Sequence, residues 1–383
     1  GKGGMCSGCA KSAPPFVDTA LGRQYQKIGY DPRCRGWYNQ AIDQAPMVNA
    51  TGAAYHSLHY PQRMPVAIRD AFVQARLERR PVVLGIPFDL QNRPWEGPEE
   101  LPEPSRQIIP RQYALPPATD ELDAAVSLVS QAKRVVVFAG MGAVQAQAGE
   151  ACRELAAKTG GLLTTTLPAR GLFHDDPFCI GITGSFSTEV GLECVKNADL
   201  IIAVGASLAL HAGGGGQLWP NAQVLHIDLE PAAISQAQRV AQHHMRADAR
   251  EGTQQLVAAL PSSNTTWRDE GLAEQIRTRP ADSATFEVEP DLLDPRDAVA
   301  ALEATLPDEW EMVNSSGHCS AFFAQMPSRA QERFLTIREF GAIGNGTSFA
   351  MGVAAARPDS KVVLFDGDGS LLMNIQELET ISR

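Results

Sequence analysis

The chain has 383 residues with a formal net charge of −11, 44% hydrophobic and 20% charged residues, which is enough for two or three domains with cores of their own. No run approaches the roughly 18 consecutive apolar residues that cross a bilayer, so membrane insertion is not expected. The negative charge and the scattered Lys and Arg also argue against a nucleic-acid partner. The chain starts at Gly1 with no apolar signal segment, and we interpret this start as a truncation.

Seven cysteines, an odd number spread over a long chain, favour reduced thiols and a cytoplasmic location over a disulfide framework. Cys6 and Cys9 form a CxxC, but no second CxxC follows. Cys34 alone does not complete a four-ligand zinc site. We therefore expect free thiols at these positions.

Two segments rich in proline and polar residues, Pro94–Pro117 and about 261–295, separate three stretches of α/β pattern. The pattern predicts a fold of successive doubly wound parallel-sheet domains, covering 1–93, 118–260 and 290–383, with 1–20 unassigned. In the first stretch, a helix from Pro65 with Ile68, Phe72 and Ala75 on one face precedes a strand at Val82–Pro87. Strands are predicted at 135–139, 162–166, 200–204 and 224–228 in the second stretch, and near 310–313 and at 362–365 in the third.

The strongest chemical signal is an apolar strand from Lys361 to Phe365 that runs into Gly367-Asp368-Gly369-Ser370, with a helix predicted to begin near Asn374. Glycines let backbone N–H groups approach a phosphate, and a following helix adds its positive end. A carboxylate beside a diphosphate needs a cation between them, and Mg²⁺ is commonly held by one or two carboxylates together with phosphates. The pattern therefore predicts a diphosphate site with Asp368 as a Mg²⁺ ligand, although an Asp-Gly turn alone is common.

A second motif lies one helix upstream, where Gly341-Ala342-Ile343-Gly344 follows Phe340 and precedes an Ala-rich helix that ends in Ala-Arg-Pro at 356–358. Together with GDGS and the QEL that follows it, residues 340–380 resemble thiamine-diphosphate-dependent enzymes of the acetolactate synthase and 2-oxoacid decarboxylase superfamily. The segments VVVFAGMG at 135–142 and ADLIIAVGAS at 198–207 are similar to strand ends of that family's central domain. Residues 39–91 resemble the end of its pyrimidine-binding domain, and the last stretch resembles the start of its diphosphate-binding domain.

The resemblance implies thiamine diphosphate and Mg²⁺ as cofactors. Asp368 would be a Mg²⁺ ligand, the backbone of Gly367, Gly369 and Ser370 would face the diphosphate, and Gly341, Ile343 and Gly344 would also contact the cofactor. Ile343 stands where the family places a bulky apolar residue that brings the pyrimidine amine to the thiazolium carbon; without the family, a core residue is equally expected. His318 falls near the active-site edge, or is a plain loop histidine. The family's activating Glu lies upstream of the matched residues, and its second Mg²⁺ ligand, an Asn, lies further beyond Asp368 than the chain extends. We therefore expect this chain alone to bind cofactor poorly and to be inactive.

Some relatives hold FAD or ADP in the central domain, but Leu208 follows Gly205-Ala206-Ser207 where flavin-binding relatives commonly have Arg, so FAD is doubtful. Gly140-Met141-Gly142 alone is a weak nucleotide signal, and His226 is expected to be a strand residue without catalytic duty. The resemblance implies a lyase or transferase acting on a 2-oxoacid, with carboligation favoured over simple decarboxylation, in a homodimer or homotetramer. An NAD-binding, deacetylase-like protein and a non-catalytic nucleotide-binding protein remain as alternatives.

Overall fold

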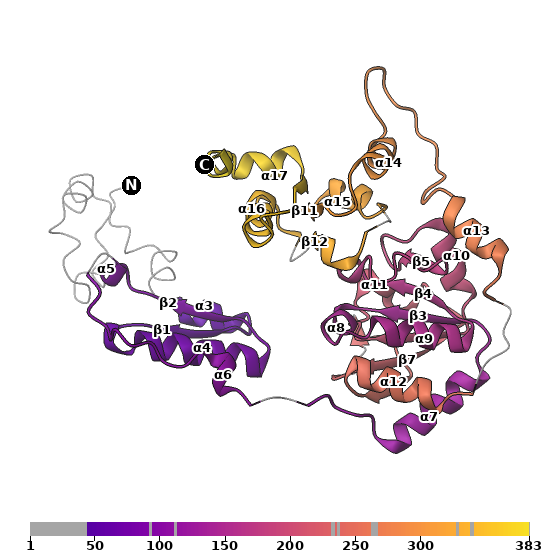
Figure 1. The fold of residues 1–383 in the computed structure, drawn as a ribbon, viewed down its shortest axis with the longest axis horizontal. Helices are drawn as coiled ribbons and strands as arrows, with labels where there is room; N and C mark the ends of the chain where they lie inside the picture. The colour runs from indigo at the N-terminus through magenta and orange to yellow at the C-terminus, as the bar shows by residue number, and fades with distance from the viewer. Residues whose placement is uncertain are drawn as a thin grey trace, which may run out of the picture. The chain divides into compact units, whose positions relative to one another are not determined.

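The computed structural model describes residues 44–91, 94–110, 113–230, 234–235, 238–261, 267–326, 329–337 and 341–382. The chain divides into two compact units, Gly1–Gln112 and Tyr113–Arg383 (Figure 1). The predictions for residues 1–20, for Cys6, Cys9 and Cys34, and for Phe340 lie outside the described residues. None of the helices in the described residues is long and apolar enough to span a membrane.

The first unit contains a two-stranded parallel sheet in which Ala54 of one strand pairs with Val82 of the other. The long helix begins at a proline in its first turn, where the missing N–H leaves no helical hydrogen bond unmade. It buries Met64 and Ala71, but Phe72, which was predicted on the same face, is exposed. The elements are α3 (Ala45–Ala50), β1 (Ala54–Ser57), α4 (Met64–Glu78), β2 (Val82–Gly85), α5 (Phe88–Gln91) and α6 (Ser105–Ile108).

The second unit holds a six-stranded parallel sheet of order β10-β7-β6-β3-β4-β5. Its strands are β3 (Val135–Ala139), β4 (Leu162–Thr165), β5 (Cys179–Ile182), β6 (Leu200–Val204), β7 (Gln223–Asp228) and β10 (His243–Arg246). β3 and β6 are buried throughout, which explains their uninterrupted apolar sequences. A short antiparallel pair, β8 (Ile234–Ser235) and β9 (Gln238–Arg239), follows β7.

Helices cover both faces of this sheet, as Figure 1 shows, and each face has its own apolar cluster. One face is packed by α7 (Thr119–Gln131), α8 (Met141–Gln145), α9 (Gly149–Thr159) and α12 (Ala249–Ala259). The other is packed by α10 (Glu189–Asn197) and by α13 (Glu270–Thr278), through Leu272 and Ile276. The predicted linker at 261–295 therefore contains a helix that belongs to the packing of the central sheet.

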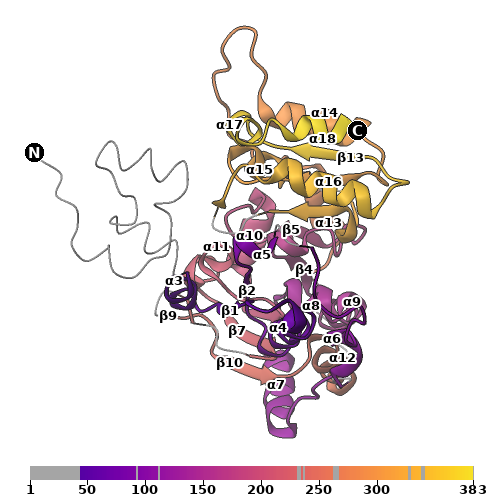
Figure 2. The same cartoon turned by 90° about the vertical axis from the view of Figure 1, so that its left-hand side faces the viewer.

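The same unit ends in a three-stranded parallel sheet of order β12-β11-β13, with β11 (Glu311–Asn314) in the middle. The other two strands are β12 (Phe334–Thr336) and β13 (Val362–Phe365). The helices of this region are α14 (Pro295–Thr305), α15 (His318–Phe323), α16 (Gly346–Ala356), α17 (Asp368–Met373) and α18 (Glu377–Ser382). Figure 2 shows α16, α17 and α18 gathered near β13. The whole architecture is α/β with parallel sheets, as the sequence predicted.

Several elements differ from the prediction. Strands β5, β10 and β12 and helix α15 were not predicted, because each is short and lacks a sustained apolar period. The helix expected near Asn374 instead begins at Asp368, and Asn374 separates α17 from α18 with a non-helical backbone. The division into two units leaves the predicted boundary between 118–260 and 290–383 a prediction.

Candidate cofactor site

The loop after β13 leaves open space beside its glycines. Gly367 has extended backbone and precedes the first turn of α17, whose N–H groups have no partner inside the helix. A side-chain carbon placed on Gly367 or Gly369 would meet no heavy atom within 4 Å. The described residues therefore leave room for an anion to approach the backbone of this loop.

Asp368 is exposed at the first position of α17, directly after the carboxyl end of β13. No hydrogen bond or ion pair with another described residue holds its carboxylate. Within the described part of the chain, no group of three or more His, Cys, Asp or Glu side chains could hold a metal ion by itself. A divalent cation at Asp368 would need oxygens from a ligand, which suits Mg²⁺ bound through one carboxylate and phosphates.

The second glycine motif forms a turn that is tied to the Asp368 loop. Gly341 and Gly344 have φ of +65° and +88°, in the left-handed region that glycine adopts without a steric penalty. The backbone N–H of Gly344 donates to Ser370 Oγ at 2.8 Å, and the Asn374 side-chain amide donates to the Gly344 carbonyl. The structure thus brings the two sequence motifs together, and it uses the Ser370 hydroxyl, whose backbone alone was predicted to matter.

Ile343, at the tip of this turn, is 45% exposed and is not a core residue. Such a side chain is available to contact a bound ring system. The contact of Ile343 with the cofactor stays a prediction.

Buried oxygens without a donor lie beside the same loop. Asp366 Oδ2 and Asn345 Oδ1 have no hydrogen-bond partner among the described residues. Asp366 Oδ2 would lie 2.6 Å from a side-chain carbon added to Gly346, so a larger residue there would displace the Asp366 carboxylate. Since buried acceptors are normally satisfied by a donor or a cation, these two atoms fit a site that awaits a ligand.

His318 begins α15, which follows the carboxyl end of β11 at the same edge of the sheet as the Asp368 loop. Its side chain is exposed, and its neighbour Gly317 has φ of +116°. The parallel register between β11 and β13 brings these two loops to one edge. His318 is therefore at the rim of the candidate site, and its role stays a prediction.

At the carboxyl ends of β3 and β6 in the central sheet, the backbone of the two following loops is in direct contact. Gly140 N and Gly142 N donate to Val204 O and Gly205 O at 3.0 and 2.9 Å, so these amides are already used. The Gly205 carbonyl would lie 2.3 Å from a side-chain carbon on Gly140. His226 is buried in β7, as expected for a strand residue. That FAD is doubtful here stays a prediction.

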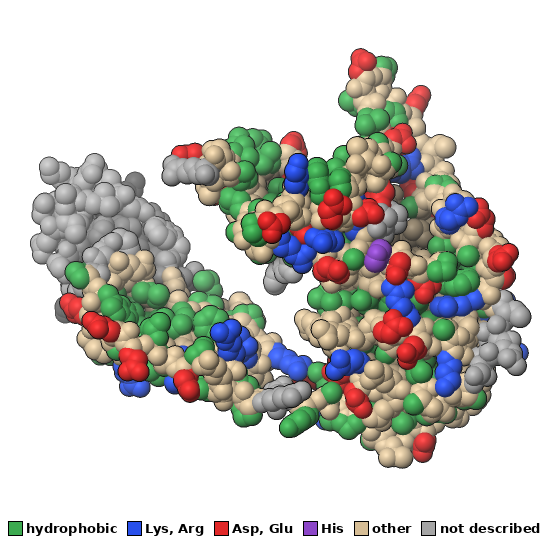
Figure 3. All heavy atoms as spheres, in the orientation of Figure 1, with side chains coloured by type: hydrophobic (Ala, Val, Ile, Leu, Met, Phe, Trp, Pro, Cys, Tyr) green, Lys and Arg blue, Asp and Glu red, His purple; other side chains and the backbone are tan. Residues whose placement is uncertain are grey.

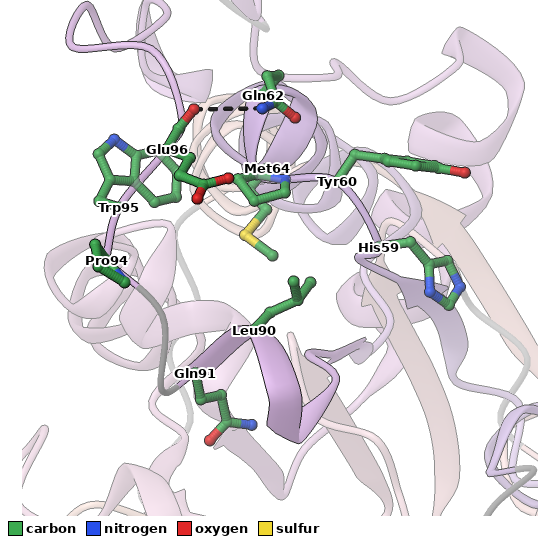
Figure 4. A pocket seen from close by; sticks show the side chains of 10 residues that line it. His59, Tyr60, Gln62, Met64, Leu90, Gln91, Pro94, Trp95 and Glu96 are labelled. Carbon is green, nitrogen blue, oxygen red and sulfur yellow. Dashed lines mark hydrogen bonds between the residues drawn. The ribbon is translucent and has the colours of Figure 1, made fainter. Parts of the chain in front are cut away.

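Two cavities were not predicted. One of about 400 Å³ in the first unit follows the ends of β1 and β2, and Figure 4 shows Met64 and Leu90 pointing into it with Trp95 and His59 on either side. The other, of about 680 Å³, lies in the second unit beside the edge strand β5 and is lined in part by Arg170, Cys179 and Met326. Neither contains residues of the two glycine motifs.

Comparison with known families decides the identity of this arrangement. Residues 122–256 match the family described as "Thiamine pyrophosphate enzyme, central domain", and residues 315–383 match "Thiamine pyrophosphate enzyme, C-terminal TPP binding domain". The chain belongs to the thiamine pyrophosphate enzymes. The second match includes both glycine motifs, Asp368 and His318.

Curated proteins that are similar to this chain include plant and bacterial acetolactate synthases. Acetolactate synthase 1, chloroplastic, of Zea mays is 31% identical over 335 residues, which cover 83% of this chain and 50% of the relative. Acetolactate synthase isozyme 1 large subunit of Escherichia coli is 30% identical over 331 residues, covering 84% of this chain and 56% of the relative. The chain thus spans about half the length of the curated relatives it matches.

Proposed function

We propose that this chain contributes the diphosphate- and Mg²⁺-binding part of an enzyme that joins a 2-oxoacid-derived unit to an acceptor, as an acetolactate synthase does. The observation that carries the proposal is the unpaired Asp368 in an open glycine loop, tied through Ser370 to the Gly341–Gly344 turn. When bound, thiamine diphosphate supplies a carbon nucleophile and an electron sink. The relatives' names support carboligation.

In this proposal each residue has a limited task. Asp368 holds Mg²⁺ against the diphosphate, and the first-turn N–H groups of α17 donate to phosphate oxygens. Ile343 supports the cofactor from its exposed position, and His318 faces the substrate from the edge of the site. The buried Asp366 and Asn345 oxygens would accept hydrogen bonds from donors that the bound cofactor supplies.

The cofactor assignment is tested by titration calorimetry of the 383-residue chain with thiamine diphosphate, with and without Mg²⁺. We expect saturable, Mg²⁺-dependent binding that Asp368→Asn abolishes. Asp359→Asn, which removes an exposed carboxylate from the turn before β13, is the matched control and should bind as the unaltered chain does. Binding that is insensitive to both Mg²⁺ and Asp368→Asn would contradict the assignment.

We further propose that this chain alone binds cofactor more weakly than micromolar and does not turn over. No residue of the chain is assigned to the family's activating Glu or to its second Mg²⁺ ligand. Micromolar affinity in the same titration would contradict this second proposal while supporting the first.

The parent protein would act in the cytoplasm as a homodimer or homotetramer, which sedimentation of the complete protein tests.

A 2-oxoacid decarboxylase of the same superfamily is the alternative activity. The site described here serves both reactions, since the fate of the activated unit depends on whether an acceptor is bound. Product analysis of the parent protein with pyruvate separates them: carboligation gives acetolactate, and simple decarboxylation gives acetaldehyde. Acetaldehyde as the sole product would overturn the carboligase proposal.

A further inference from the structure

An arginine of the central domain is buried among residues of the C-terminal domain. Arg170 follows β4 and a short 3₁₀ turn at Leu167–Ala169, and it is 3% exposed. The next residue, Gly171, has φ of +84°, and a side-chain carbon there would lie 2.3 Å from the Arg329 carbonyl. The backbone therefore turns at Gly171 in a way that lets the two domains approach closely.

The Arg170 guanidinium contacts the end of α15 and the rings beside it. Nη2 donates to the carbonyls of Met326 at 2.6 Å and Phe323 at 3.0 Å. The guanidinium carbon lies 3.9 Å from the centre of the Phe334 ring and 4.6 Å from that of Phe323. The cation adds a donor at the end of α15, where the Phe323 carbonyl also accepts from the Met326 N–H at 3.1 Å, and it stacks on aromatic faces.

The burial of this charge is unfavourable in itself. Desolvation lowers the pKa of Arg170 to about 9, although the nearby Glu303 carboxylate acts in the opposite direction. Nη1 has no hydrogen-bond partner among the described residues. An apolar side chain would fill the slot between the two rings without this cost, so packing alone does not explain an arginine here.

The helix that Arg170 holds leads directly to the candidate site. α15 begins at His318, and the residues before it are tied at the other end, where Ser315 Oγ lies 3.3 Å from Ser370 Oγ. Ser316 Oγ donates to the Ile337 carbonyl at 3.0 Å. The loop between β11 and α15 is thus fastened to the Asp368 loop on one side and, through α15, to the central domain on the other.

We propose that Arg170 is a positioning residue through which the central domain fixes α15, and thereby holds Gly317 and His318 at the edge of the Asp368 loop. This inference rests on the proposed function only in one respect, which is the identity of the ligand bound at that edge. The fixed helix is a property of the chain without ligand. The central domain would then act on the site through α15, without touching the cofactor.

Hydrogen exchange of the full chain, followed by mass spectrometry, tests the positioning role with Arg170→Met and Arg170→Lys. Met keeps an apolar stem between the rings but donates no hydrogen bond, whereas Lys keeps the charge and the donors. We expect amides of residues 318–326 to exchange at least about tenfold faster in the Met variant, with substantial rescue by Lys. A Met variant as protected as the unaltered chain would overturn the proposal, and so would a Met variant in which exchange of β3 and β6 rises as much as that of residues 318–326, because the effect would then be global unfolding.

Arg153→Met is the matched control, because Arg153 also lies over an aromatic ring, Phe173, and donates to a backbone carbonyl, that of Leu172, but inside the central domain. It should leave residues 318–326 unchanged. Thiamine diphosphate titration of the same variants separates the two proposals. Failure of the unaltered chain to bind would count against the proposed function alone, while binding unaffected by Arg170→Met despite faster exchange would overturn the link from α15 to the site.

Discussion

The central sheet and the C-terminal sheet of the second unit are built from similar sequences but differ in burial. Every residue of β3 is buried, whereas every residue of β13 is only partly buried. Helices α16 to α18 and the turn between the last two expose Phe349, Leu372, Ile375 and Leu378, and apolar side chains are visible on that part of the surface in Figure 3. The comparison teaches that the candidate site follows a strand whose side chains are less completely packed than those of β3 and of its own neighbour β11.

The difference predicts that the same substitution has unequal effects in the two regions. Leu155, on α9, is 0% exposed in the core of the central sheet, and Leu372, on α17, is 63% exposed. Leu155→Ala should lower the free energy of unfolding by about 2–5 kcal/mol, because it leaves a cavity in a packed core. Leu372→Ala should change it by less than about 0.5 kcal/mol. Urea unfolding of both variants measures this, and equal losses would contradict the difference in packing.

Glu311 is a buried charge of the C-terminal region, and its removal should produce the next largest effect. Glu311, at the start of β11, is buried and pairs with Arg333 and, at 2.8 Å, with Arg357. Glu311→Gln should cost about 1–3 kcal/mol, because two arginines lose a charged acceptor. The exposed Glu274–Arg277 pair on α13 is the control. Because exposed ion pairs contribute little to stability, Glu274→Gln should cost no more than about a few tenths of a kcal/mol. Similar losses in urea titrations of the two variants would refute the argument from burial.

Helix capping also differs between α12 of the central domain and α17. The Asp248 carboxylate accepts hydrogen bonds from the Arg250 and Glu251 N–H groups at 3.0 and 3.1 Å, while α17 has no side-chain cap. Asp248→Ala should therefore lower stability by about 1 kcal/mol, and Asp248→Asn should retain most of it. If thermal unfolding shows the Asn variant to be as unstable as the Ala variant, charge and not capping explains Asp248.

Thiol alkylation gives the mildest test, because it requires no substitution in the chain. Burial raises the pKa of the Cys152 thiol to about 12, so it stays neutral throughout the alkaline range below that value. Cys319, at the start of α15, is only partly buried. We expect iodoacetamide at mildly alkaline pH to modify Cys319 well before Cys152, with Cys152 reacting only as the pH rises toward its pKa or as the core opens. Peptide mass spectrometry over time shows the order, and equal rates would contradict it.

The long apolar strands and the glycine motifs were readable in the sequence because their signals are local. β3, β6 and β13 follow from uninterrupted apolar runs, and the Asp368 loop follows from glycines placed after a strand. β10, with the sequence His-His-Met-Arg, has no such run and becomes a strand only because β7 offers a partner. The bond from Gly344 N to Ser370 Oγ joins residues 26 positions apart, and no local pattern indicates it.

By itself, the sequence determined the α/β class, the place of the Asp368 loop at the end of a strand, and the membership in a thiamine pyrophosphate enzyme family. These depend on side-chain period and backbone freedom, which neighbouring residues encode. The tertiary structure alone decided that Ser370 ties the two glycine loops, that Asp366 and Asn345 oxygens are left without donors, and that Arg170 reaches α15 from another domain. Contacts of this kind form only when distant segments pack, and their energies depend on burial that no single segment possesses.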